Sequence, residues 1–241
     1  MVKENPKLVK YLNALQINWF EYQSGVSLLT KLGVNNAQVL PNCKKLNPIE
    51  KESITKHSNK VFEFCTFSRV MPEKGIDDAI EAVHKINALS NGIIVKLDIY
   101  GPIEESYKKE FFSKLENHKN EICYKGIIES SQSVETLKNY FMLLFPTRWH
   151  GEGFPGTILD CYASALPIIA SDINANKEII KHQKTGIIYP NKGFNNLYEC
   201  ILWAINNKNE IYSMKYNCID EYDNYTFETI GNIICKEIRG F

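Results

Sequence analysis

Residues 61–89, VFEFCTFSRVMPEKGIDDAIEAVHKINAL, place a β-rich run, a polar turn and an amphipathic segment in direct succession. Residues 61–68 are rich in aromatic and β-branched side chains, a composition that predicts a strand. Residues 76–89 carry isoleucine and valine at helical spacing, which predicts a helix with one buried face. A strand, a short turn and a helix make the first part of a βαβ unit, so this stretch predicts an α/β fold.

The same alternation continues along the chain. Each parallel strand followed by a right-handed crossover helix predicts a doubly wound, Rossmann-like parallel sheet, whose ligands bind at the carboxyl ends of the strands. A polar, tyrosine-containing stretch is expected to separate the last two helices. Further strands are expected at 93–100, 122–127, 143–146, 167–170 and 186–189, and helices at 107–115, 134–141, 153–164, 197–205 and 227–238.

The first 59 residues follow a different pattern. One strand-like run at 38–40 comes after an amphipathic segment, and residues 44–59 are polar and contain Pro48. We therefore expect two parts: residues 1–59 as a fragment with a linker, and residues 60–241 as the α/β domain.

The composition excludes several classes of function. Lysine plus arginine and aspartate plus glutamate are each 28 in the 241 residues, so no global positive field attracts nucleic acid. The apolar runs are shorter than the ~18 residues of a membrane span, and the polar start has no secretory signal. The seven cysteines contain no CxxC pair, which favours reduced thiols in the cytoplasm and gives no metal site.

Two cations occupy the turn after the first strand of the α/β domain, within SRVMPEKG at 68–75. Arg69 offers a planar fork of donors and Lys74 a mobile point charge, and both suit a diphosphate at a helix start. The alternative is a solvated loop with two ordinary surface cations.

Two acids occupy WHGEGFPGTILD at 149–160, after the strand at 143–146. The glycines allow the backbone to approach a ligand closely, Glu152 lies in the loop, and Asp160 is expected on the helix face that looks back toward it. Carboxylates accept hydrogen bonds from paired hydroxyls, so a sugar ring and a ribose are suitable ligands. The alternative is a surface acid and a helix-face salt bridge.

Two reactive side chains nearby are expected to have ordinary roles. His150 stands beside a glycine turn, where a solvated or capping histidine is more common than an acid or base. Cys161 is expected to be a small buried thiol and not a nucleophile.

Together, Ser-Arg-x4-Lys-Gly after a strand and Glu-Gly-Phe-x5-Asp farther along resemble the donor-binding half of GT-B-fold glycosyltransferases. The retaining, nucleotide-sugar-dependent family 4 is the most similar. The resemblance extends over roughly residues 35–205. It includes, in family order, LDIYG at 97–101, KGII at 125–128, PT at 146–147, ALPIIAS at 165–171, EII at 178–180 and TGII at 185–188.

The resemblance implies a role for each matching residue. Arg69 and Lys74 would bind the donor diphosphate, and Glu152 would contact the transferred sugar. Because those cations would replace a divalent ion and the chain has no Asp-x-Asp triplet, neither a metal nor another cofactor is expected. Gly153, Phe154, Pro155, Gly156 and Thr157 would help to hold the sugar and phosphate, Asp160 the ribose, and Gly126, Ile127 and Ile128 the base.

The implied activity is transfer of a sugar from a nucleoside diphosphate sugar to a saccharide or lipid-linked acceptor, in polysaccharide biosynthesis. The resemblance also allows peripheral contact of the protein with a membrane. The chain departs from the family at two positions. Asp160 replaces the usual glutamate, and Ala165 replaces a glycine, which a turn tolerates only if φ is negative there.

The front of the chain leaves alternatives open. Leu32-Gly33-Val34 and residues 39–42 resemble the end of the family's acceptor domain, so residues 1–59 are expected to be a remnant of it. A partner chain could supply the acceptor domain, and the chain could instead be a non-catalytic nucleotide-sugar-binding subunit or an inactive truncated fragment. A dinucleotide enzyme is disfavoured because no GxGxxG follows the strand at 61–68.

Overall fold

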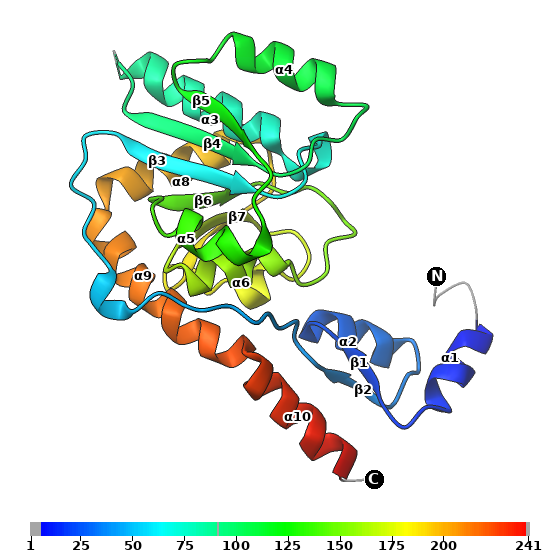
Figure 1. Cartoon of the computed structure of the whole chain (residues 1–241). Coiled ribbons are helices and arrows are strands. Elements are labelled where there is room, and N and C mark those ends of the chain that lie inside the picture. Colours follow the sequence, from blue (N-terminus) through cyan, green and yellow to red (C-terminus); the bar gives the residue numbers. More distant parts are fainter. Residues whose placement is uncertain (1–5, 91, 240–241) are drawn as a thin grey trace.

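The computed structural model describes residues 6–90 and 92–239 and contains two parallel sheets (Figure 1). The smaller sheet pairs β1 (Asn18–Phe20) with β2 (Ala37–Val39). The larger sheet has six strands. These are β3 (Phe62–Phe67), β4 (Val95–Tyr100), β5 (Ile122–Gly126), β6 (Met142–Phe145), β7 (Ile168–Ser171) and β8 (Gly186–Tyr189).

The order of the large sheet is β5-β4-β3-β6-β7-β8, the order of a Rossmann sheet. The chain adds strands in one direction from β3 to β5 and then returns to add β6, β7 and β8 on the other side of β3. The expected doubly wound α/β fold is confirmed. Its switch point lies between β3 and β6.

Helices cover both faces of this sheet. The side chains of one strand alternate between faces, so Phe64 and Met142 pack with α3 (Ile76–Leu89) and α8 (Phe194–Asn206). Cys65 and Leu143 pack with α5 (Ser133–Leu137) and α6 (Gly156–Ala163). All four residues of β6 are buried, as expected for a central parallel strand. The helices are α1 (Pro6–Asn13), α2 (Gln23–Lys31), α3 (Ile76–Leu89), α4 (Lys108–Glu116), α5 (Ser133–Leu137), α6 (Gly156–Ala163), α7 (Asn176–Ile179), α8 (Phe194–Asn206), α9 (Lys208–Tyr222) and α10 (Phe227–Arg239).

The prediction that a polar stretch, and not a helix, separates the last two helices was wrong. It forms α9, because Ile211, Met214, Cys218 and Tyr222 recur at helical spacing and are all buried. The polar residues between them lower the mean hydropathy and conceal that stripe.

Two helix boundaries also differ from expectation. The helix expected at 134–141 ends at Leu137, because the Phe141 N–H donates to the carbonyl of Glu63 and leads the chain into β6. The helix expected from 153 begins at Gly156, because Pro155 takes an extended conformation as its N-cap. Residues 153–155 therefore belong to the loop.

The condition placed on Ala165 fails, since its φ is +50°. Ala165 follows the end of α6 and takes a left-handed conformation. Its N–H donates to the carbonyl of Tyr162, and the Leu166 N–H donates to that of Cys161. This is the Schellman pattern, which usually has glycine at this position, so the alanine tolerates a strained φ to close the helix.

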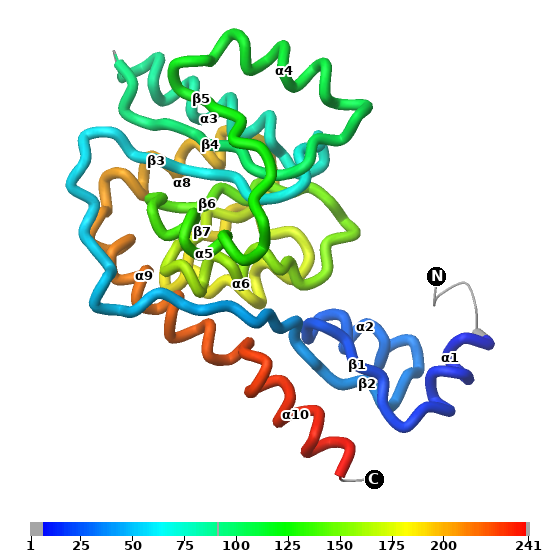
Figure 2. Tube along the Cα trace, viewed as in Figure 1, coloured from blue at the N-terminus to red at the C-terminus, as the bar shows by residue number. Residues whose placement is uncertain are grey.

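The amino-terminal part lies to one side of the large sheet (Figure 2). It holds α1, α2 and the small sheet, and an extended segment connects it to β3. The division at residues 59 and 60 stays a prediction. Residues 1–5, where we expected no secretory signal, lie outside the described residues. No helix in the described part of the chain has both the length and the apolar character to cross a membrane.

A glycine should be required at position 75, where the loop after β3 meets the end of β6. Its φ is +70°, and a Cβ there would lie 2.0 Å from the carbonyl oxygen of Pro146. We expect Gly75→Ala to lower the free energy of unfolding by about 2–3 kcal/mol in a urea titration. The matched control is Gly231→Ala in α10, where a Cβ meets nothing within 4 Å. Equal effects of the two substitutions would contradict this assignment.

Candidate functional site

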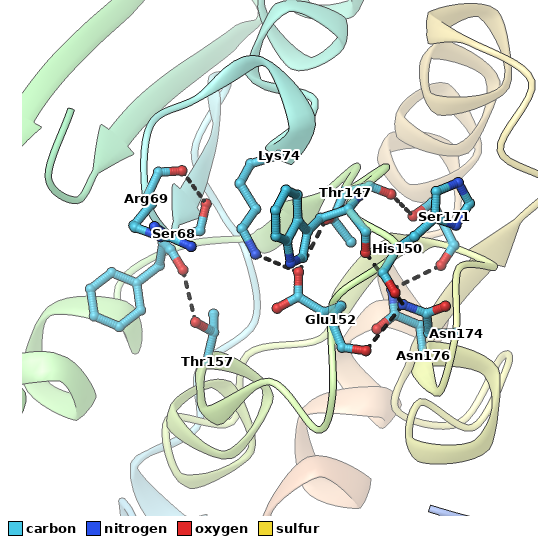
Figure 3. Close-up of polar contacts among 12 residues, drawn as sticks. Ser68, Arg69, Lys74, Thr147, His150, Glu152, Thr157, Ser171, Asn174 and Asn176 are labelled. Atoms are coloured by element: carbon cyan, nitrogen blue, oxygen red, sulfur yellow. Dashed lines mark hydrogen bonds and ion pairs between the residues drawn. The ribbon is translucent and has the colours of Figure 1, made fainter. Parts of the chain in front are cut away.

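The loops that follow β3 and β6 meet at the switch point of the sheet. Lys74 ends the short 3-10 helix Pro72–Lys74 after β3, and Glu152 lies in the loop after β6. Their side chains form an ion pair (Figure 3). The two side chains are only 8% and 13% exposed, so both charges are largely removed from water. Crevices of this kind, at the carboxyl ends of central strands, are where doubly wound sheets bind ligands.

The turn that carries Lys74 is fixed by its own sequence and by the neighbouring loop. Pro72 begins the turn, the Lys74 N–H donates to the carbonyl of Met71 at 3.0 Å, and Gly75 ends it in a left-handed conformation. The Arg148 N–H donates to the carbonyl of Glu73 at 2.7 Å. The two loops are therefore joined by backbone as well as by the ion pair.

A second ion pair lies behind this junction. The Arg148 guanidinium donates to the carboxylate of Asp78 at 2.8 Å. Burial raises the pKa of Asp78, and the positive charge of Arg148 opposes that rise. Asp78 lies in the first turn of α3, where a negative charge also interacts favourably with the helix dipole.

Glu152 is held by two residues to which the sequence analysis assigned no role in the site. The Thr147 hydroxyl donates to its carboxylate at 3.2 Å. The Asn174 amide donates to the carbonyls of His150 and Glu152, each at 3.0 Å. Asn174 has a φ of +47°, a conformation that asparagine tolerates better than most residues. The only local feature of the sequence that could have indicated this contact was the presence of an asparagine shortly after β7.

Arg69 lies on the surface directly after β3, in the same loop as Lys74 (Figure 3). Within residues 6–90 and 92–239, no carboxylate pairs with its guanidinium. The two predicted cations therefore differ: Lys74 is buried and paired, whereas the fork of Arg69 is available to a ligand.

The loop from Gly153 to Thr157 is tied to other parts of the chain. The Phe154 N–H donates to the carboxylate of Glu21 at 2.8 Å, and the Thr157 hydroxyl donates to the carbonyl of Phe67 at 2.9 Å. Phe154 packs in the core beneath α6. A cleft of about 430 Å³ lies in front of the loop, and residues 19–22 and 150–153 line it. Gly156, at the start of α6, has open space around it.

Asp160 is not in direct contact with Glu152. Its side chain is 2% exposed, and the carboxylate accepts hydrogen bonds from the Lys44 ammonium at 2.6 and 2.7 Å and from the Ser133 hydroxyl at 2.6 Å. Asp160 therefore has the salt bridge of the alternative interpretation, whereas Glu152 is not the surface acid of that alternative, because it is only 13% exposed and pairs with Lys74. Lys44 lies 116 residues from Asp160, so no local pattern could have indicated the pair.

Gly126 is the last residue of β5, and residues 127 and 128 follow it at the same edge of the sheet. Gly126 has a φ of +83°, and its carbonyl accepts the Gly101 N–H at 2.9 Å. Ile127 is 68% exposed, whereas Ile128 packs against the core cluster that includes Tyr100 and Leu143. These residues lie two strands away from the ion pair at the switch point.

The two side chains with expected ordinary roles agree with that expectation. His150 is exposed beside the glycine turn. Cys161 is fully buried, and burial raises the pKa of its thiol well above the ordinary value. A thiol in that state is a poor nucleophile.

The sequence is similar to known enzymes over most of its length. It is 25% identical over 189 residues to a poly(ribitol-phosphate) alpha-N-acetylglucosaminyltransferase of Staphylococcus aureus (strain COL), covering 76% of this chain and 35% of the relative. It is 26% identical over 200 residues to the capsular polysaccharide biosynthesis glycosyltransferase CapM of Staphylococcus aureus, covering 79% and 51%. The chain thus spans about a third to a half of the length of these relatives.

Solved structures share the fold. The crystal structure of TarM superposes with a TM-score of 0.77 at 20% identity, covering 98% of this chain and 46% of that one. Anabaena Alr3699/HepE in complex with UDP superposes with a TM-score of 0.79 at 15% identity, covering 100% and 69%.

The family model described as "Glycosyl transferases group 1" matches residues 49–220. This match contains the whole six-stranded sheet, the Lys74 turn and the Glu152 loop. The chain therefore belongs to the group 1 glycosyl transferases.

Proposed function

We propose that this chain is the donor-binding part of a glycosyltransferase that takes a sugar from a nucleoside diphosphate sugar. The observation that carries the proposal is the contact between Lys74 and Glu152 at the switch point, with Arg69 exposed in the same loop. A cation beside a carboxylate suits a ligand whose phosphate is bonded to a sugar. The neutral sugar hydroxyls meet the acid, and the phosphates meet the cations.

Arg69 and Lys74 bind the diphosphate in this proposal. When the bond between the sugar and the phosphate breaks, negative charge grows on the leaving oxygen. Two fixed positive charges at that position stabilise the transition state more than the ground state. They supply the charge that a divalent ion supplies in other transferases, so we expect the reaction to need no metal.

Glu152 contacts the transferred sugar, and the backbone of residues 153–157 supports it at the start of α6. Gly156 begins that helix, and a Cβ there would meet nothing within 4 Å, so we infer that a ligand has room beside the helix start. Asp160 binds the ribose. Because Lys44 and Ser133 occupy its carboxylate, the ribose hydroxyls join or replace those partners. Residues 126–128 lie near the base.

The acceptor, the stereochemistry and the compartment are further parts of the proposal. We infer a saccharide or lipid-linked acceptor, with retention of configuration as in family 4. The GtfA/B complex, which shares the fold with a TM-score of 0.75, is an assembly of two kinds of chain, and a partner chain could complete the acceptor site here. All seven cysteines are free thiols, which supports a reducing cytoplasmic location.

Calorimetric titration of the chain with UDP, GDP and ADP is the direct test of donor binding. We expect one nucleotide to bind more tightly than the others, because the base contacts residues 126–128. A chelator should leave that affinity unchanged. If none of the three nucleotides binds, or if binding requires a divalent metal, the proposal fails.

Arg69→Ala and Lys74→Ala should each weaken binding of the preferred nucleotide by about tenfold to a hundredfold. Each removes a charge-assisted contact of about 1.5–3 kcal/mol. Lys109→Ala, an exposed lysine on α4, is the control for the loss of one charge. Circular dichroism checks the fold, since Lys74→Ala also leaves Glu152 without its ion-pair partner. Unchanged affinity in both folded variants would exclude the diphosphate assignment.

Asp160→Asn should separate ribose binding from phosphate binding. Asparagine keeps the shape but removes the charge that accepts the hydroxyl hydrogens, so the affinity for a nucleoside diphosphate should fall several-fold more than the affinity for pyrophosphate. Ser133→Ala is the comparison variant, because it removes a hydrogen-bond donor to the same carboxylate. Equal losses for both ligands would show that Asp160 supports the fold and does not contact ribose.

A further inference from the structure

A second cluster of ligand-type side chains lies at the opposite end of the large sheet. His84 comes from α3, and His118 and Glu121 come from the turn between α4 and β5. The Nδ1 atoms of the two histidines lie 2.8 and 3.1 Å from the same carboxylate oxygen of Glu121. One donor atom from each residue lies within 4.8 Å of the others, the one such group of three found in the described part of the chain.

The carboxylate of Glu121 is fixed by a polar residue behind it. The Asn87 amide donates to its second oxygen at 2.6 Å and to the carbonyl of Val95 at 2.8 Å. The amide oxygen of Asn87 accepts the N–H groups of Ile94 and Val95 at 2.9 and 3.0 Å. This network holds the first oxygen of Glu121 toward the two imidazoles, as outer partners hold a metal-ligating carboxylate.

The cluster is open to solvent on one side. The side chains of Glu121 and His118 are 9% and 19% exposed, whereas that of His84 is 53% exposed. A cleft of about 290 Å³ lies in front of them, lined by residues that include Asn117 and Asn120. An ion can therefore enter and keep water as a further ligand.

We propose that His84, His118 and Glu121 bind a zinc ion. Two imidazoles and one carboxylate are a zinc donor set, and three protein ligands leave a fourth position for water. A tetrahedral zinc ion with bonds of about 2.0–2.1 Å separates its ligand atoms by about 3.4 Å. The observed separations of 2.8 and 3.1 Å need only a small opening, and the exposed His84 ring has room to move.

The ion would cross-link α3 to the turn before β5, at the amino ends of the strands. Lys74 and Glu152 lie at the carboxyl ends, so this site is independent of donor binding and supplies no group to that reaction. The sequence analysis missed it because His84 and Glu121 are 37 residues apart and only the fold brings them together.

The test is calorimetric titration of the chelator-treated chain with zinc chloride, together with thermal unfolding at each zinc concentration. We expect one zinc per chain. The unfolding midpoint should rise by about 5 °C or more when free zinc is about 100-fold above its Kd. His84→Ala and His118→Ala should abolish both effects. His182→Ala, which removes an exposed histidine elsewhere, should keep them.

Cobalt substitution separates this site from the free cysteines. Cobalt bound by imidazole and carboxylate lacks the thiolate charge-transfer bands that a cysteine site shows, so we expect none. Their presence would overturn the proposal, as would zinc binding that survives both histidine substitutions. If zinc does not bind at all, the cluster is a hydrogen-bonded network only. Nucleotide titrations should be the same with and without zinc, so the two proposals fail independently.

Discussion

The pairing of β3 with β6 is the constraint on which the candidate site depends. The two strands pair over only two positions, Phe64 with Met142 and Cys65 with Leu143, whereas β3 pairs with β4 over its whole length. Beyond this short junction β3 stays paired only with β4, and β6 only with β7. The two strands then lead to different helices, because β3 joins α3 and β6 joins α6. The meeting of the two following loops is a product of topology, and side chains are needed to define its geometry.

Several contacts define it. The Arg148 N–H binds the carbonyl of Glu73, the Thr157 hydroxyl binds the carbonyl of Phe67, and Lys74 pairs with Glu152. A largely buried ion pair adds little net stability, since removing both charges from water offsets much of their attraction. Its main effect is preorganisation. Each charge fixes the other, so the proposed phosphate and sugar would meet groups that need little reorientation.

Much of the fold was predictable because it is encoded locally. The β3–α3 unit follows from a strand pattern of period two and a helix pattern of period 3.6, and α3 begins and ends where the pattern predicts. α9 was missed because polar side chains lie between the buried apolar residues of its stripe, so the average composition resembles a loop. At Ala165 the closing hydrogen bonds of α6 impose a positive φ that an alanine does not signal.

The charged residues of the candidate site could be identified from the sequence, but their ion-pair and hydrogen-bond partners could not. Lys74 and Glu152 were each identified from nearby residues, but their contact joins positions 78 residues apart. Lys44 and Glu21 were not identified at all, since their partners in the loop and helix after β6 lie 116 and 133 residues away. Local sequence specifies which groups a loop carries, and only the assembled sheet specifies which groups meet.

Those two missed residues show how the amino-terminal part bears on the site. Glu21 accepts the N–H of Phe154, and Lys44 binds the carboxylate of Asp160, so both are polar partners of the segment from Gly153 to Asp160. A ligand bound there competes with these groups or joins them, and its affinity includes the free energy of rearranging them. In the proposed donor complex, Glu21 and Lys44 would therefore be coupled to donor binding through the polar atoms that they share with the segment from Gly153 to Asp160.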